Sequence, residues 1–414
     1  MGVLTLSRPF PSLLQDHRLF LLLAHHAMIV HPRLSRKALP LTCLLSLPFL
    51  LLLLAYFSLD SSRMSSIDMD GRFPRKIWQT WRTDPFSLDE RDLPVARSWT
   101  IKNPGHRYEL LTDQNDVHYI ETHFGPHGIL HRPDIIHTYR TLTAKIIKAD
   151  LLRYLIMYIE GGVYADIDVE ALRPVDRFIP PRFNERDMDM VVGVEIDEPQ
   201  LNQHHLLGPK SQSFCQWTFL AKPRLPVLLR LIDGILAWLN RLAEQQHCAS
   251  IADVHLDFDD VIRGTGPSAF TDAIMAEISL SVGHSVSWSD TFHDLQEPRL
   301  VGRVLVLTVE AFAAGQGHSD SGDHNSRAAL VKHHYHASGW PSVHPRFSHA
   351  MFGEVESCNW NRDCVRRWDE DTAAFDSLSL DEQERRLAVK HTMEASAADI
   401  EHEVAGKSAQ YLIQ

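Results

Sequence analysis

The sequence has little of what a nucleic-acid-binding protein needs. Its 414 residues include 41 Lys and Arg against 53 Asp and Glu, which gives a formal net charge of −12. Phosphate backbones attract basic surfaces, and no basic run with interleaved aromatic residues is found. Internal repeats and N-x-S/T sequons are also missing, so we expect no N-linked glycan. The remaining composition, 44% hydrophobic and 23% charged, is ordinary for a globular protein.

One long hydrophobic run lies near the N-terminus. Residues 38–59 contain no charged residue and are long enough for a membrane-spanning helix. Arg33, Arg36 and Lys37 precede this run and Asp60 follows it, so the positive-inside rule leaves the N-terminus in the cytosol. We therefore predict a cytoplasmic tail over 1–37, a type II signal anchor over 38–59 and a stem over 60–72. A cleaved signal peptide is the alternative.

Cysteine is scarce, with five in the whole chain. Cys43 lies in the anchor, and the other four would lie in an oxidising lumen, where three pairings are open to them. Cys358 and Cys364 could close a short loop. Their C-x5-C spacing is a poor zinc signature because no second pair accompanies it.

The most informative stretch begins with a predicted helix. Apolar residues recur every three to four positions over 145–159, which is typical of an amphipathic helix. Gly161 and Gly162 follow, and glycine favours the backbone conformation at which helices often end. Residues 163–169 are then predicted as a strand that delivers two aspartates.

Alternation along this strand places Tyr164, Asp166 and Asp168 on one face. Two neighbouring carboxylates at the end of a buried strand repel each other, and a divalent cation stabilises both. Oxygen ligands favour Mg²⁺, Mn²⁺ or Ca²⁺ over zinc, and such a cation keeps open positions for a diphosphate. The alternative is that the D-x-D is a solvated turn or a helix N-cap.

The string from Ala149 to Val169 resembles the D-x-D sugar-binding region of nucleotide-sugar-dependent glycosyltransferases, and of glycosyltransferase family 32 in particular. That family includes fungal Golgi initiation-specific α-1,6-mannosyltransferases. The resemblance, which extends over about 73–340, implies a GT-A fold: an α/β, Rossmann-like domain with a mostly parallel sheet. It also implies α-1,6 transfer of mannose from GDP-mannose to a glycan acceptor with retention, Mn²⁺ or Mg²⁺ at Asp166 and Asp168, and a Golgi membrane location. For a retaining enzyme, attack assisted by the leaving phosphate needs no covalent nucleophile, and none is evident.

The resemblance also implies roles for individual residues. Asp150 and Arg153 would contact the donor sugar, with a surface ion pair as the alternative. A histidine near residue 334 would be a third metal or diphosphate ligand; the register favours His334, with His333 and His336 as alternatives. Further donor-side candidates are Trp78, Gln79, Thr80, Trp81, Asp113 and Tyr164, with Arg140 as a weaker phosphate candidate. Trp78 and Trp81 could equally be core aromatics, and Asp113 could cap the next helix.

The remaining pattern alternates strands and helices, as an α/β domain does. Strands are predicted at 76–81, 108–111, 189–195 and 304–307, and helices at 93–102, 212–220, 224–240 and 268–278. A Thr265-Gly266-Pro267 turn opens the last of these helices. We predict a catalytic domain over 73–350 and a helical extension over 351–414.

Three other functions are compatible with parts of this pattern. A family 32 enzyme could use another donor or acceptor, such as UDP-galactose or the head group of inositol phosphoceramide. A D-x-D phosphatase of the haloacid-dehalogenase type would carry its motif on the first strand, whereas this one lies mid-chain after a long helix. An inert membrane-anchored assembly subunit would have no need of intact Asp150, Arg153, Asp166 and Asp168.

Overall fold

The computed structural model describes residues 71–336 and 344–411, without the side chains of 397–411. Residues 70–414 form one compact unit. Its strands are β1 (Lys76–Trp81), β2 (Arg107–Thr112), β3 (Gly162–Ala165), β4 (Val169–Ala171), β5 (Met190–Asp197), β6 (Gln212–Phe214), β7 (Thr218–Ala221), β8 (Arg299–Val301), β9 (Val304–Leu307) and β10 (Val331–His333). Its α-helices are α3 (Asp92–Lys102), α4 (Asp116–Phe124), α5 (Pro133–Thr141), α6 (Lys145–Ile159), α7 (Pro226–Gln245), α8 (Phe258–Gly264), α9 (Pro267–Val282), α10 (Trp288–Thr291), α11 (Val309–Ala313), α13 (Arg362–Asp376) and α14 (Leu380–Tyr411).

The central sheet is mixed. Its strand order is β2-β1-β3-β7-β5-β9-β8, with β6 added to one part of β5. Strands β2, β1, β3, β5 and β9 run in one direction, and β7, β6 and β8 run against them. The prediction of an α/β domain with a mostly parallel sheet is therefore confirmed. Strands β4 and β10 form a separate antiparallel pair.

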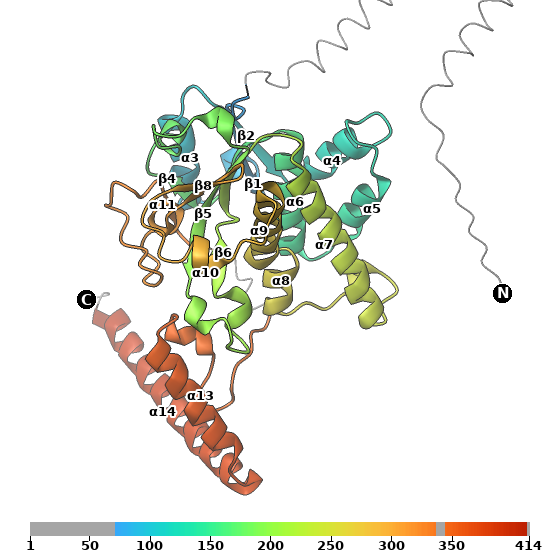
Figure 1. Ribbon diagram of the computed structural model, residues 1–414. Helices are drawn as coiled ribbons and strands as arrows, with labels where there is room; N and C mark the ends of the chain where they lie inside the picture. Colours follow the sequence, from blue (N-terminus) through green and yellow to red (C-terminus); the bar gives the residue numbers. More distant parts are fainter. Residues whose placement is uncertain (1–70, 337–343, 412–414) are drawn as a thin grey trace, which may run out of the picture. The chain divides into compact units, whose positions relative to one another are not determined.

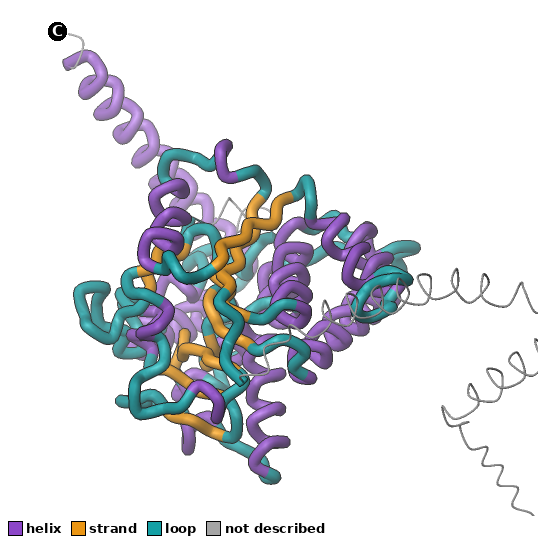
Figure 2. Tube along the Cα trace, turned by 90° about the horizontal axis from the view of Figure 1, so that it is seen from above, coloured by secondary structure: helices purple, strands orange, loops and turns teal. Residues whose placement is uncertain are grey.

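Helices cover both faces of this sheet (Figures 1 and 2). On one face, α6 packs against β1, β3 and α7, and α7 packs against α9. On the other face, α11 packs against β5, and α3 packs against β4. Helix α6 has the predicted bounds, but nearly all of its side chains are buried rather than one stripe. The reason is that the sheet, α4 and α7 enclose it, so it is a core helix.

Two predictions of secondary structure were wrong. Residues 212–220 form strands β6 and β7 instead of a helix, because these short apolar segments pair with β5 and β3. The predicted strand over 163–169 is interrupted: β3 ends at Ala165, and Asp166 to Asp168 form a turn before β4. The two aspartates therefore project from a turn and not from a pleated strand.

The C-terminal segment packs on the segment after β5 through a small second core. Leu201 and Leu207, which follow β5, contact Val355 and Trp368. A disulfide between Cys358 and Cys364 joins this segment to the first turn of α13, as the short spacing had suggested. In the part of the chain that the structure describes, no helix is long and apolar enough to cross a membrane. The predicted anchor over 38–59 lies outside the described residues.

The turn between α6 and β3 requires glycine at position 162, and a substitution there tests this requirement. Its φ is +101°, and a Cβ there would lie 2.5 Å from the carbonyl oxygen of Lys76. We expect Gly162→Ala to lower the free energy of unfolding by about 1–3 kcal/mol, measured by urea denaturation. Gly234→Ala is the control: its Cβ would meet nothing within 4 Å, and in the interior of α7 alanine should stabilise by about 0.5–1 kcal/mol. Equal effects of the two substitutions would contradict this interpretation.

Candidate active site

The Asp166-Ile167-Asp168 turn (the DXD turn) is held in place by its backbone. The N–H of Asp166 donates to the carbonyl of Trp217 at 2.9 Å, and the N–H of Val169 donates to the carbonyl of Asp166 at 3.1 Å. The side-chain amide of Gln79, a fully buried residue of β1, donates to the same Asp166 carbonyl at 2.8 Å. The turn follows the carboxyl end of β3, the edge of an α/β sheet where ligands usually bind.

Arg153 lies beneath this turn as a buried cation. Its side chain is 7% exposed, and Nη1 lies 3.0 Å from Asp150 Oδ1 while Nη2 lies 3.1 Å from Asp166 Oδ1. Within the described residues Nε has no partner, and Nη1 has only its ion pair with Asp150. The predicted pair of Asp150 and Arg153 is therefore a buried pair that extends to the DXD turn, and not a surface ion pair. The unsatisfied Nε–H is suited to donate to an oxygen of a ligand.

Burial shapes the charges of these carboxyls. It raises the pKa of Asp150 to about 6, a shift that the positive charge of Arg153 and a 2.7 Å hydrogen bond from Thr265 Oγ1 oppose. Burial also raises the pKa of Asp166, again against the attraction of Arg153. The guanidinium is thus the group that keeps anionic carboxylates in a poorly solvated place.

Hydroxyl groups connect β1 and β3 to the same turn. Tyr164 donates to Asp166 Oδ1 at 2.8 Å, and its oxygen lies 3.0 Å from Thr80 Oγ1. Arg153 also lies over the ring of Tyr164, 5.2 Å from its centroid. The predicted residues Thr80, Tyr164, Arg153 and Asp166 therefore form one connected cluster.

Strand β10 brings a histidine to the second aspartate. His333 Nε2 lies 3.4 Å from Asp168 Oδ2, and the ring packs against Trp217 with centroids 4.6 Å apart. His334, the predicted ligand, points instead to Glu170, with its Nε2 3.0 Å from Oε2. The cause is the register of β10 on β4, which places adjacent side chains on opposite faces. Burial acts to raise the pKa of Asp168, but the hydrogen bond from His333 is among the interactions that hold it below its usual value.

A further acidic residue at this place was not found from the sequence. Asp92, at the start of α3, is completely buried, and its Oδ1 lies 2.8 Å from His336 Nδ1. The backbone N–H of His336 donates to Asp168 Oδ2 at 2.9 Å. Asp92 Oδ2 has no partner within the described residues. No local signal could reveal Asp92, because its partner lies 244 positions away in the chain.

The other candidates lie outside this cluster. Trp78 is buried and donates from Nε1 to the carbonyl of Gly161 at 3.2 Å, so it holds the glycine turn. Trp81 lies beside Arg82, whose guanidinium is 5.3 Å from its ring centroid. Asp113 does not cap α4; it pairs with exposed Lys145 at 2.7 Å. Arg140 is exposed and pairs with Glu121.

The oxygen-rich set at the DXD turn fits a divalent cation. Mg²⁺ and similar ions are commonly held by one or two carboxylates and completed by substrate phosphates, so Asp166 and Asp168 suffice on the protein side. Both carboxylates remain partly accessible, with 24% and 13% of their side chains exposed. Among the described residues, the buried Nδ1 of His333 has no partner, while the ring packs between Trp217 and Tyr335. Asp166 and Asp168 are thus the residues that would hold the ion, with His333 beside Asp168.

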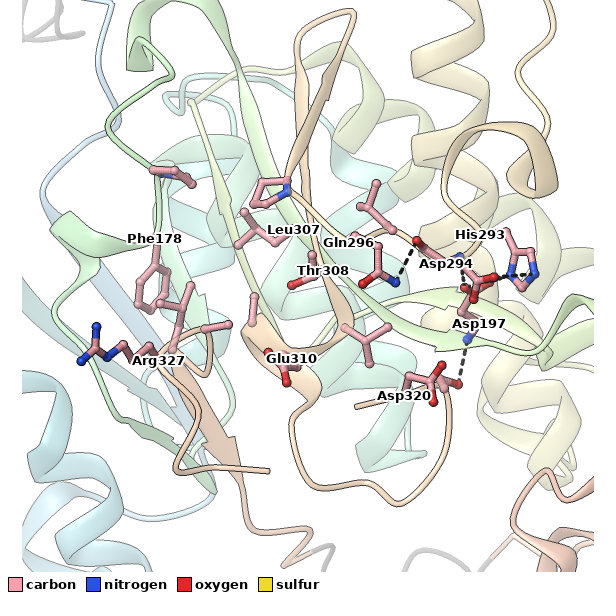
Figure 3. Close-up of a pocket in the computed structure, with 18 of the residues that line it drawn as sticks. Phe178, Asp197, His293, Asp294, Gln296, Leu307, Thr308, Glu310, Asp320 and Arg327 are labelled. Carbon is pink, nitrogen blue, oxygen red and sulfur yellow. Dashed lines mark hydrogen bonds and ion pairs between the residues drawn. The ribbon is translucent and has the colours of Figure 1, made fainter. Parts of the chain in front are cut away.

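A second group of possible ligands lies at the end of β5. Oxygen and nitrogen atoms of Asp197, His293 and Asp294 lie within 4.8 Å of one another. They border a cleft of about 1080 Å³ (Figure 3), which has none of the DXD residues in its lining. Both oxygens of Asp197 already accept hydrogen bonds, from Trp288 Nε1, His293 Nδ1 and the N–H of Asp294. The hydrogen bonds of Asp197 therefore hold the segment after α10 in place, and this accounts for the group without a metal ion.

Residues 89–183 match the family described as glycosyltransferase sugar-binding region containing DXD motif. This segment contains Asp150, Arg153 and the DXD turn.

Among curated proteins, the chain is similar to initiation-specific alpha-1,6-mannosyltransferases. It is 32% identical to that of Schizosaccharomyces pombe over 64% of this chain and 63% of the relative, so it spans somewhat less than two thirds of the relative's length. It is 28% identical to that of Candida albicans, over 66% of this chain and 73% of the relative. Among solved structures, the PaToxG glycosyltransferase is 16% identical and covers 56% of this chain and 81% of its own, with a TM-score of 0.33. That score is too low to carry an argument.

Replacement of Arg153 should show that the ion-pair network supports the fold as well as the site. We expect Arg153→Met to lower the free energy of unfolding by about 3–5 kcal/mol, because it leaves Asp150 and Asp166 buried without their cation. Lys145→Met, on the exposed end of the same helix, should change it by less than about 1 kcal/mol. Chemical denaturation followed by circular dichroism measures both. A similar loss of unfolding free energy in the two variants would contradict the view that the buried ion pairs of Arg153 stabilise the fold more than an exposed ion pair does.

The two neighbouring histidines offer a matched pair for the metal site. Because His333 faces Asp168 and His334 faces Glu170, we expect His333→Ala to weaken Mn²⁺ binding about 10–100-fold and His334→Ala to leave it nearly unchanged. Electron paramagnetic resonance of free Mn²⁺ measures both affinities without requiring turnover. A greater loss of Mn²⁺ affinity in His334→Ala than in His333→Ala would show that His334 is the ligand instead.

Proposed function

We propose that this protein is a GT-A-type, metal-dependent glycosyltransferase that moves mannose from GDP-mannose to a glycan acceptor in an α-1,6 linkage, with retention. The observation that carries the proposal is the buried guanidinium of Arg153, which pairs with Asp150 through Nη1 and with Asp166 of the DXD turn through Nη2, while its Nε has no partner among the described residues. Similarity to initiation-specific alpha-1,6-mannosyltransferases supports the choice of mannose and of the linkage.

Each residue of the cluster has a role in this proposal. Arg153 donates to hydroxyls of the donor sugar, and Asp150, held by Thr265, accepts from them. Asp166 and Asp168 hold Mn²⁺ or Mg²⁺, which when bound neutralises the charge that develops on the departing diphosphate. Tyr164 and Gln79 keep Asp166 oriented through its side chain and its carbonyl. Because retention by attack on the same face needs no protein nucleophile, the site requires no further reactive group.

The proposed location is the Golgi lumen, with a single N-terminal anchor over 38–59 and a type II orientation. The uncharged run and the basic residues before it support the anchor. The disulfide between Cys358 and Cys364 supports an oxidising compartment for the catalytic part.

Donor binding tests this proposal directly. The full chain in detergent micelles would be titrated with GDP-mannose and with UDP-galactose by calorimetry, with and without Mn²⁺. We expect GDP-mannose to bind and UDP-galactose not to bind, and we expect the binding of GDP-mannose to require Mn²⁺.

Asp168→Asn should lower turnover at least about 100-fold, since loss of the ion removes several kcal/mol of leaving-group stabilisation. Asp371→Asn, an exposed carboxylate of α13, is the control and should leave turnover unchanged.

The other outcomes distinguish the alternatives. Tighter binding of UDP-galactose would retain the fold and the site but change the donor. Transfer to inositol phosphoceramide in preference to a mannoside would retain the donor and change the acceptor. Binding of neither nucleotide sugar by the folded protein would favour an inert assembly subunit.

A further inference from the structure

Tyr335 is a large aromatic residue that stays exposed beside the DXD turn. It follows β10 directly, and 53% of it is accessible to solvent. Its ring centroid lies 4.0 Å from that of His333, whose Nε2 lies 3.4 Å from Asp168 Oδ2. An exposed aromatic ring at a candidate active site calls for an explanation, and none of the roles assigned above to the metal and the donor uses this residue.

The backbone of Tyr335 is strained, and the DXD turn is the cause. Its φ is +49°, in the left-handed region that a bulky side chain rarely adopts. The N–H of His334 donates to the carbonyl of Asp168 at 2.9 Å, and the N–H of His336 donates to Asp168 Oδ2 at 2.9 Å. Two amides therefore grip one aspartate, and the residue between them takes the unusual conformation. Glycine or asparagine would fit there with less strain, so a tyrosine at this place indicates a use for its ring.

The ring of Tyr335 is the outer member of a column of three rings. Trp217 packs on His333 with centroids 4.6 Å apart, and His333 packs on Tyr335. Glu195 Oε1 accepts from Trp217 Nε1 at 3.1 Å and fixes the inner end of the column. Exposure rises outward, from 5% for Trp217 to 13% for the side chain of His333 and 53% for Tyr335. The apolar C–H face of a pyranose ring could stack on the outer ring and extend the column.

The column lies on the opposite side of the DXD turn from the groups assigned to the donor. Those groups reach Asp166 from α6 and β1. Tyr335 instead reaches Asp168 through His333, which packs on Trp217 directly before β7. Strands β1 and β7 flank β3 on its two sides. The exposed ring is therefore placed for a second substrate rather than for the donor.

The proposed chemistry also requires the acceptor near Asp168. In same-face attack, the acceptor hydroxyl approaches the anomeric carbon on the side from which the diphosphate departs. That side is the side of the carboxylates that would hold the metal. A sugar ring stacked on Tyr335 is one imidazole ring away from Asp168, so its hydroxyls can reach this place.

We propose that Tyr335 is the platform on which the acceptor stacks, and that its occupant is a neutral hexopyranoside ring. This inference rests on the proposed glycosyltransferase function. It assigns Tyr335 a contact with the acceptor and none with the metal or the donor.

The test uses the full chain in detergent micelles, with methyl α-D-mannopyranoside as the acceptor. In assays with GDP-mannose and Mn²⁺, Tyr335→Asn should raise the KM for the mannoside at least tenfold. Saturation-transfer NMR should detect the mannoside on the wild type and lose its signal in this variant. The calorimetric affinity for GDP-mannose should stay within twofold of the wild type. Because asparagine tolerates the left-handed conformation, the melting temperature should not fall.

Two further variants separate the ring from the backbone. Tyr335→Phe keeps the ring and should restore the KM to within about threefold of the wild type. His247 is also exposed, has a φ of +55° and lies in the loop after α7. His247→Asn relieves the same kind of strain elsewhere, so it is the matched control and should leave the KM unchanged.

Each other result overturns a defined part. An unchanged KM in Tyr335→Asn, with normal donor binding, would refute the platform and leave the proposed function intact, as would a wild type that binds GDP-mannose but not the mannoside. A matching loss of GDP-mannose affinity would place the ring at the donor and refute the separation of the two sugars. Equal losses in Tyr335→Asn and Tyr335→Phe would refute stacking on the ring. Absence of GDP-mannose binding in the wild type would refute the proposed function itself. If Tyr335→Asn fails to fold, Tyr335→Leu, which keeps apolar bulk without an aromatic face, decides with the same expected rise in KM.

Discussion

The arrangement of this protein depends on one buried cation. Arg153 lies in a helix that the sheet and its neighbours enclose, and two carboxylates, Asp150 and Asp166, meet its guanidinium. A buried charge without a partner is very unfavourable, so the helix, the glycine turn and the DXD turn must take up positions that keep these groups together. The geometry of the DXD turn and the stability of the fold are therefore coupled in this region. Nε of the same guanidinium has no partner among the described residues.

Two parts of the chain that differ in their relation to the family meet around this network. Residues 89–183 match the DXD-containing sugar-binding region and include the DXD turn. Strand β10 and the residues after it, which lie outside that match, bring His333 and Tyr335 to the same turn.

Local patterns predicted the elements that local forces determine. Helix α6 and strands β1 and β9 have the predicted bounds, because apolar periodicity and the glycine stop act within a few residues. The helix predicted for residues 212–220 was wrong, because a short buried apolar run is compatible with a helix or a strand, and the strands that pair with it decide between the two. The choice between His333 and His334 depends on the register of β10 against β4, and a shift of one residue reverses every side chain.

The sequence alone determined the types of chemical group at the site and their order along the chain: a helix with Asp150 and Arg153, a glycine turn and two aspartates. These groups lie within about 20 residues of one another, so periodicity and turn chemistry suffice to find them. Only the tertiary structure decided which distant residues join them, namely Asp92, Glu195, Trp217, His333 and Tyr335. Their meeting results from strand pairing and core packing between residues 22 to 244 positions apart, and no local pattern encodes such pairings.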